Sequence, residues 1–233
     1  MGKKTFKMDA LVIGAGKGIG FETVKSLLGK GLKVCAVSRS VNSLLNLGHP
    51  NLHCIEADIA DAESRASMVA CIAGTGLAFS TVIITAGQLI KKPYEELNQD
   101  DFTSLFITNV YAVFDSIRLI KPFLSANFAH IVTIGSMGGV GGTLKFPGMV
   151  FYSSSKSALA CMTECMAVEL EKEPIHINCL ALGAVETEMK QAAFPEFKAP
   201  HSALEMGEWV AWFGLEAGKF FNGKVLPVSI STP

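Results

Sequence analysis

Seven short, strongly apolar runs recur along the chain, and segments with helical periodicity separate them. Most of these runs have no polar face, as expected of parallel strands that helices cover on both sides. The runs are Met8–Ile13, Leu32–Ser38, Leu52–Glu56, Thr81–Thr85, His130–Gly135, Ile175–Leu180 and Lys224–Ser229. The helical segments are Gly18–Lys30, Asp61–Ala73, Asp100–Ala126, Met149–Lys172 and Ala203–Ala217. This alternation predicts an α/β fold with a doubly wound, seven-stranded and mostly parallel sheet and helices on both faces.

No sequence feature divides the 233 residues into smaller units. The chain has no linker rich in Pro, Gly or Ser, no repeat and no low-complexity tract, so we expect a single Rossmann-fold domain over residues 1–233. Hydrophobic residues make up 49% of the chain and charged residues 18%, which excludes a disordered protein. A net charge of −1 gives no sign of a nucleic-acid-binding surface.

The sequence also favours a cytoplasmic protein over an exported or membrane-bound one. Asp9 interrupts the basic N-terminus before a signal peptide could form, and glycines break the longest uncharged stretch, residues 74–90. The six cysteines lie singly in apolar stretches, so we expect free, buried thiols. Cys161 and Cys165 stand four residues apart, but no His or carboxylate is spaced to complete a metal site, so core packing is expected and a metal is not.

A glycine-rich loop follows the first predicted strand and leads directly into a helix. Residues 14–20 read Gly-Ala-Gly-Lys-Gly-Ile-Gly. Glycines let the backbone turn tightly and approach a pyrophosphate, and the helix N-terminus offers it unpaired N–H groups. In the first βα turn of such a chain, this loop indicates a dinucleotide site.

Four polar residues later in the chain suggest catalysis. Ser136 ends the fifth predicted strand, Tyr152 and Lys156 stand four apart at the start of a helix, and Asn109 lies within the preceding helix. Taken singly, Asn109 could bond only locally and Ser136 could be a turn cap. The five histidines are expected to be structural or exposed, with His201 nearest the predicted substrate cleft.

Together these motifs resemble the short-chain dehydrogenase/reductase family, over about residues 8–229. Glycines at 14, 18 and 20 are similar to the family's TGxxxGxG, with Ile13 in place of the threonine, and Asn109, Ser136, Tyr152 and Lys156 match its catalytic residues. The resemblance implies an NADP(H)-dependent oxidoreductase that interconverts a ketone, or a 3-oxoacyl group, and a secondary alcohol by hydride transfer. The implied partner is a small carbonyl or alcohol substrate.

The resemblance also assigns roles. Tyr152 is the general acid and base, Ser136 holds the carbonyl oxygen, and Lys156 binds the nicotinamide ribose and lowers the pKa of Tyr152. Asn109 anchors a water that resupplies protons. The cofactor-binding residues implied are Gly14, Lys17, Gly18, Ile19, Gly20, Ser38, Arg39, Asp58, Ile59, Ala86, Gly87, Asn109, Tyr152, Lys156, Gly183, Val185 and Thr187.

NADP(H) is expected in preference to NAD(H). Lys17 and Arg39 are cations that suit the 2′-phosphate of NADP, and the second strand ends without the carboxylate that would bind the 2′-hydroxyl of NAD. Asp58 matches the family's adenine-contacting position and could also cap the next helix.

Three features depart from the family pattern. Ile84 and Thr85 replace both asparagines of its NNAG turn, and Leu182 replaces the proline before Gly183. The segment between Ser136 and Tyr152 is longer than usual, and it borders the expected substrate site. Residues 188–201 are short and are predicted to form a modest apolar lid.

The two long helices, 100–126 and 149–172, are apolar around more than one stripe. They predict a homodimer or homotetramer, although loops could cover them instead, and Pro122 should end or bend the first helix. Two alternative functions fit part of this pattern. A catalytically idle NADP-binding sensor or scaffold would not need all four catalytic residues, and a methyltransferase would want an acidic residue where Arg39 stands.

Overall fold

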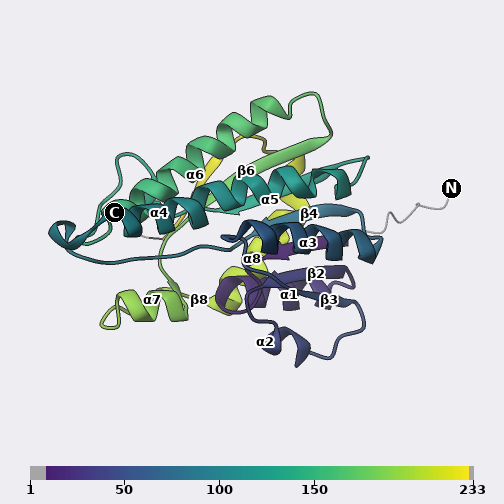
Figure 1. Ribbon diagram of the computed structural model, residues 1–233, viewed down its shortest axis with the longest axis horizontal. Coiled ribbons are helices and arrows are strands. Elements are labelled where there is room, and N and C mark those ends of the chain that lie inside the picture. Colours follow the sequence, from purple (N-terminus) through teal and green to yellow (C-terminus); the bar gives the residue numbers. More distant parts are fainter. Residues whose placement is uncertain (1–8, 231–233) are drawn as a thin grey trace.

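The computed structural model describes residues 9–230, and it places seven parallel strands in one sheet in the order β3-β2-β1-β4-β5-β6-β9 (Figure 1). The strands are β1 (Asp9–Ile13), β2 (Lys33–Ser38), β3 (Leu52–Glu56), β4 (Phe79–Ile84), β5 (Ala129–Ile134), β6 (Ile175–Leu182) and β9 (Val225–Val228). All seven predicted strands are therefore confirmed; Met8 and the C-terminal residues 231–233 lie outside the described part. The order reverses between β1 and β4, where ligands bind in open α/β sheets.

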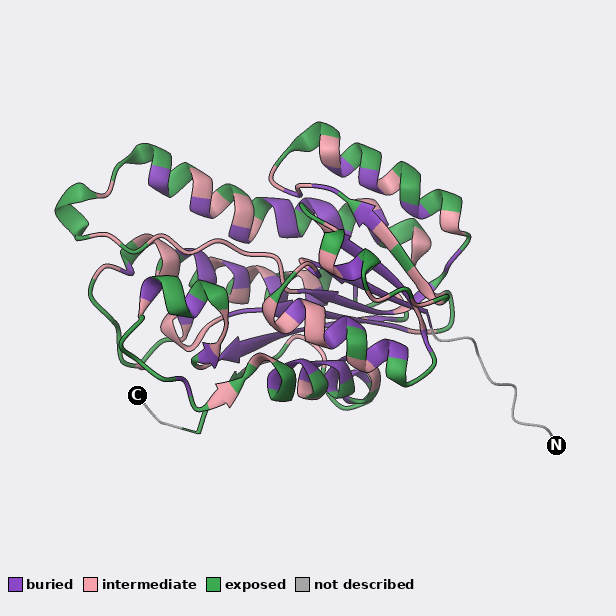
Figure 2. Cartoon of the chain, turned by 90° about the horizontal axis from the view of Figure 1, so that it is seen from below, coloured by how far each residue is buried: buried purple, intermediate pink, exposed green. Residues whose placement is uncertain are grey.

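Alternate residues of the strands build two cores, one on each face of the sheet. Leu11 and Ile13 pack beneath α3 (Ala62–Thr75), α5 (Ala112–Ile120) and α6 (Val150–Glu169). Ala10 and Val12 face α1 (Gly18–Gly29) and α8 (Ala203–Glu216). Buried residues accordingly fill the strands and the inward helix faces, while the outward faces are exposed (Figure 2). The two-sided burial explains why the strands are apolar throughout.

The predicted helix 100–126 is broken into four pieces. It comprises α4 (Gln99–Phe106), the π-helical turn η2 (Ile107–Tyr111), α5, and the 3₁₀ turn η3 (Lys121–Phe123) that contains Pro122. The π turn carries one extra residue, and it turns Asn109 fully into the interior. The other 3₁₀ turns are η1 (Tyr94–Glu96), η4 (Met137–Gly139) and η5 (Ala217–Lys219), and a short helix, α2 (Asn42–Leu45), follows β2.

The segment after β6 forms a small unit beyond the carboxyl edge of the sheet (Figure 1). It contains β7 (Val185–Glu186), α7 (Glu188–Ala193) and β8 (His201–Ser202), with Val185 paired to His201. We call residues 188–199 the lid. β6 itself runs two residues further than expected, because Leu182, unlike proline, can continue the ladder opposite Val228.

The cysteines differ from their predicted burial. Cys35 and Cys179 are buried and Cys54 is partly so, but Cys71, Cys161 and Cys165 are exposed. These three lie on the outward faces of α3 and α6, where apolar neighbours in the sequence do not imply a core position. Within residues 9–230, no helix has the length and apolar character needed to cross a bilayer.

Candidate active site

The loop between β1 and α1 and the first turn of α1 have room only for glycine at three positions. A Cβ on Gly14 would lie 2.4 Å from the Ala86 nitrogen, one on Gly16 would lie 2.2 Å from Ser38 Oγ, and one on Gly20 would lie 2.4 Å from the Gly14 oxygen. Gly14 also has φ +93°, which a side chain would strain. The loop is thus held against the ends of β2 and β4.

The first turn of α1 fits a pyrophosphate. The side chain of Lys17, the N-cap residue, makes no capping hydrogen bond, so it leaves the N–H groups of this first turn open to an anion. A cavity of about 940 Å³ lies beside the turn, and its walls include Gly16, Gly18 and Thr187. These observations suit a dinucleotide phosphate, as the glycine spacing predicted.

Thr85, which replaces an asparagine of the family turn, supports this loop. Its Oγ1 lies 3.1 Å from both the Ile13 and Gly14 oxygens, so its one proton is shared between them. The sequence showed only that an asparagine was missing here. It gave no sign that the hydroxyl would tie β4 to the glycine loop.

Lys17 and Arg39 are brought to one place by their neighbours. Gly16, which directly precedes Lys17, contacts Ser38 and the Ser40 backbone. Ser38 and Ser40 stand on either side of Arg39. Both cations are exposed, and none of the ion pairs found within residues 9–230 includes them. They are therefore available to an external anion.

The predicted adenine position is held by a buried ion pair. Arg65 donates to the Ile59 oxygen (2.5 Å) and to the Asp115 carboxylate (2.7 Å), which fixes the turn after β3 against α5. Asp58 Oδ1 accepts from the Ala60 nitrogen. The alternative that Asp58 caps the next helix is wrong, because Asp61 is the N-cap of α3.

Ser136 and Tyr152 meet at the carboxyl edge of β5. Ser136 Oγ accepts a hydrogen bond from the Gly138 nitrogen (3.2 Å) and caps η4, so the turn-cap role is real. Because that bond uses a lone pair, the hydroxyl proton remains free to be donated toward Tyr152. Burial raises the pKa of the Tyr152 phenol, and the hydrogen bond with Ser136 opposes the rise. The lowering of this pKa by Lys156 stays a prediction; burial and the Ser136 hydrogen bond are the two effects that act on the phenol here.

Lys156 is buried beneath the site. Its Nζ donates to the Ile134 oxygen (2.8 Å), and burial lowers its pKa to about 8, partly opposed by the Cys179 thiol. A Cβ on Gly87 would lie 3.2 Å from Lys156 Nζ and 3.3 Å from Asn109 Oδ1. Lys156 and Asn109 therefore meet over Gly87, as members of one site should.

Asn109 is held by the loop that follows β4. Its Oδ1 accepts from the Gln88 nitrogen (2.7 Å), and its Nδ2 donates to the Gln88 oxygen and to Ser155 Oγ (2.9 Å each). Both Nδ2 protons are thus committed to the protein, and acceptor positions remain for the predicted water. Gln88 and Ser155 were not predicted; the role of Gln88 is played by its backbone, which carries no sequence signal.

The residues after β6 divide between two roles. Thr187 caps α7 through Lys190, and its Cγ2 lies 3.3 Å from a Cβ position on Gly18, so it does reach the glycine loop. Gly183 instead packs against Ser229 and donates to the Val228 oxygen (2.9 Å). Gly183 therefore contacts β9, and its cofactor role stays a prediction.

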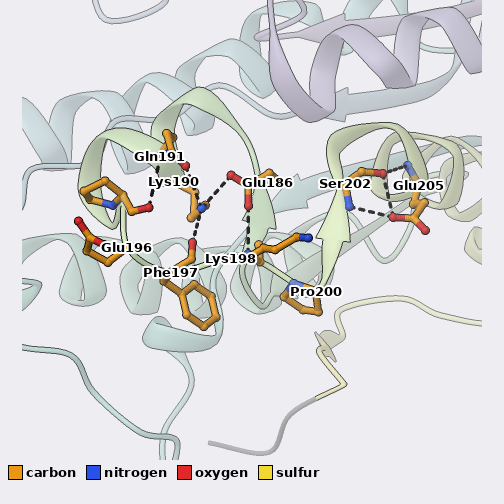
Figure 3. Close-up of a pocket in the computed structure, with 11 residues that line it drawn as sticks. Glu186, Lys190, Gln191, Glu196, Phe197, Lys198, Pro200, Ser202 and Glu205 are labelled. Atoms are coloured by element: carbon orange, nitrogen blue, oxygen red, sulfur yellow. Dashed lines mark hydrogen bonds and ion pairs between the residues drawn. The ribbon is translucent and has the colours of Figure 1, made fainter.

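The lid is fastened to itself around a second cavity of about 430 Å³ (Figure 3). Lys190 forms an ion pair with Glu186 (2.8 Å) and donates to the Phe197 oxygen. Glu186 also accepts from the Ala199 nitrogen (3.0 Å). A short, largely apolar segment is thereby given a fixed shape.

Known proteins share these features. The family model described as short chain dehydrogenase matches residues 9–197. L-xylulose reductase from Bos taurus is 31% identical over 200 residues, which cover 84% of this chain and 79% of that protein. Carbonyl reductase (NADPH) 2 from Sus scrofa is 29% identical over 186 residues, covering 78% and 73%. The solved structure of a short-chain dehydrogenase/reductase from Serratia marcescens BCRC 10948 superposes with a TM-score of 0.83 at 25% identity, covering 95% and 96%.

Proposed function

The chain belongs to the short-chain dehydrogenase/reductase family, whose members are oxidoreductases with a nicotinamide cofactor, and we propose that it interconverts a ketone and a secondary alcohol with NADP(H). A 3-oxoacyl group contains the same ketone within a larger substrate. The observation that carries the proposal is the meeting of Ser136 with Tyr152 above a buried Lys156. When bound, the cofactor supplies or accepts the hydride.

The side chains of the site suit the oxygen of such a substrate. As the carbonyl becomes an alkoxide, its oxygen needs a hydrogen-bond donor and then a proton. Ser136 offers its hydroxyl proton because Gly138 already occupies a lone pair of that oxygen. Tyr152 transfers the proton, and the raised pKa of its phenol keeps that proton in place near neutral pH.

Lys156 and Asn109 act behind the phenol. With a pKa of about 8, Lys156 is largely charged near neutrality, and it can donate to ribose hydroxyls and favour the phenolate after proton transfer. Asn109 fixes the Gln88 backbone and Ser155 next to them. An idle sensor of the same fold could use Lys156 to bind the ribose, but it would gain nothing from the hydrogen-bonded pair of Ser136 and Tyr152.

The preference for NADP(H) rests on Lys17 and Arg39. Each charge-assisted hydrogen bond to the 2′-phosphate contributes about 1.5–3 kcal/mol, so even one bond gives roughly ten- to a hundredfold discrimination. The name of the pig relative also specifies NADPH. Equilibrium titration of both cofactors, with wild type and Arg39→Ala, tests this: equal affinities in wild type, or an unchanged ratio in the variant, would contradict it.

The reaction itself is tested by a ketone panel. We expect NADPH oxidation that depends on the added ketone, followed at 340 nm for aliphatic, aromatic and 3-oxoacyl substrates. Tight cofactor binding with no turnover on any ketone would favour the idle sensor instead.

Two further proposals concern the setting of the enzyme. We infer that it is a homodimer or homotetramer joined through the outer faces of α4, η2, α5 and α6, which expose Phe102, Tyr111, Phe114 and Val168. We also infer a cytoplasmic location, which its six free thiols support because disulfides are rare there.

A further inference from the structure

Lys91 joins three loops at the carboxyl edge of the sheet, and the reaction does not use it. It lies on the loop between β4 and α4. Its Nζ donates to the Ala193 oxygen in the last turn of α7 (2.8 Å) and lies 3.9 Å from the centre of the Phe194 ring. A helix C-terminus and an aromatic face both attract a cation, so this ammonium holds the lid from across the cleft.

The third loop is the one that joins Ser136 to Tyr152. Its Phe146 ring meets the Phe194 ring edge to face, with centres 6.0 Å apart. This loop is also tied to the first: the Lys92 nitrogen donates to the Gly148 oxygen (3.1 Å). The length that sets this loop apart from the family pattern therefore has a structural use, because it carries Phe146 to the lid.

The position of this junction relates it to the reacting groups. Phe146 stands on the segment whose ends are Ser136 and Tyr152, and a Cβ on Gly148, two residues further on, would lie 3.1 Å from Lys91 Cγ. Tyr152 lies in the first turn of α6, directly after that contact. The Phe146 and Phe194 rings therefore join the segment that leads to Tyr152 with the segment that follows β6, at the carboxyl edge of the sheet where Ser136 and Tyr152 meet.

We propose that Lys91 is a specificity-determining latch: it holds Phe194 against Phe146, and the two rings form an apolar roof that limits the size of the ketone's organic group. This inference rests on the proposed ketone reduction for its substrate, but the latch itself can be observed without turnover. The bonds that Glu186 of β7 and Lys190 make shape the lid, whereas Lys91 fixes its position against the other loops.

Three variants test the latch. Lys91→Met removes the ammonium and keeps the stem, and Lys91→Arg keeps a cation over the ring. Lys219→Met is the matched control, because Lys219 is also exposed and also lies over a ring, Phe220 at 5.4 Å, on η5 at the opposite edge of the sheet. Far-UV circular dichroism and the melting temperature establish that each variant is folded.

The first measurement is the rate at which chymotrypsin cleaves native protein after Phe197 in the lid, because Pro195 blocks cleavage after Phe194. We expect Lys91→Met to be cleaved at least fivefold faster than wild type, with Lys91→Arg and Lys219→Met close to wild type. An unchanged rate in Lys91→Met would overturn the latch.

The second measurement is the ratio of kcat/KM for a bulky apolar ketone to that for a small one, with NADPH. We expect Lys91→Met to raise this ratio severalfold, mainly through KM for the bulky ketone, and Lys91→Arg to restore it. Faster cleavage with an unchanged ratio would overturn the specificity role. Faster cleavage without turnover of any ketone, wild type included, would support the latch and contradict the proposed function.

Discussion

His130 is a buried base that takes no part in the proposed reaction, and it shows how one side chain can make stability depend on pH. Its Nδ1 bonds the Gly214 oxygen and its Nε2 bonds the Asn178 amide, 3.0 Å each, so the ring is neutral. Burial lowers its pKa from 6.5 to about 4; the Gly214 bond opposes this and nearby His176 adds to it. Between these values the unfolded chain binds a proton that the folded chain cannot, so stability falls as pH falls.

We expect His130 to cost the protein about 2 kcal/mol of unfolding free energy between pH 7 and pH 5. Urea denaturation at both pH values measures the decrease in unfolding free energy in wild type and in His130→Gln. The decrease in His130→Gln should be smaller by the contribution of His130. His53→Gln, at an exposed histidine on β3, is the control. Equal losses in wild type and His130→Gln would show that other groups set the pH dependence.

Tyr152→Phe removes the proposed proton donor and leaves the ring in place. Turnover should fall at least a hundredfold, since a positioned acid contributes about 10²–10⁴. NADPH affinity by calorimetry should stay within about twofold, because the phosphates and adenine supply most of the binding. Tyr111→Phe, at an exposed tyrosine of η2, is the control. A variant that keeps a tenth of wild-type kcat would remove Tyr152 from its assigned role.

At the scale of the element, a glycine-to-alanine change in the glycine loop should have a different effect from the same change in a helix. Gly16→Ala places a Cβ 2.2 Å from Ser38 Oγ and should lower NADPH affinity at least tenfold by moving the loop. Gly74→Ala, in α3 with open space around it, should leave affinity unchanged and raise stability by up to about 1 kcal/mol. Titration and thermal melts measure both effects. Similar losses of affinity in the two variants would mean that general destabilisation is responsible.

Strands and helices that show their hydrophobic pattern within their own residues could be predicted from the sequence. β1, β2, β4 and β5 are apolar on both faces because helices cover both faces of the sheet. This composition can be recognised in the residues of each strand alone. β7 and β8 have two residues each, too few to show any period. The π turn at Asn109 depends on the Gln88 backbone, which belongs to another loop, so residues 107–111 alone give no hint of it.

The candidate site shows the same limit. The order of the motifs located Ser136, Tyr152 and Lys156, since strand ends of a parallel sheet share one edge. The direction of the Tyr152 pKa shift could not be predicted, because it depends on how deeply the phenol is buried. Thr85 and Lys91 act through hydrogen bonds to backbone carbonyl oxygens. Every residue has such an oxygen, so the sequence does not indicate which ones these side chains bind.

For the whole molecule, assembly is the main prediction. Light scattering at micromolar concentration should give the mass of a dimer or tetramer. Phe114→Glu and Val168→Glu, at residues 38% and 71% exposed on α5 and α6, should lower that mass by placing charge in the apolar interface. Leu45→Glu, at a residue 58% exposed on α2, should not. A monomeric wild type would contradict the prediction.

The contact of Thr85 and Ala86 with the glycine loop has a consequence for synthesis on the ribosome. By the end of α3, at Thr75, the emerging chain already contains the glycine loop, Arg39 and Asp58, which are the groups we propose for the adenosine half of the cofactor. The loop still lacks the hydroxyl and the backbone it rests on, because both arrive only after β4. A nascent chain stalled before residue 85 should therefore leave NADPH unbound, and cofactor capture should coincide with the docking of β4 beside β1.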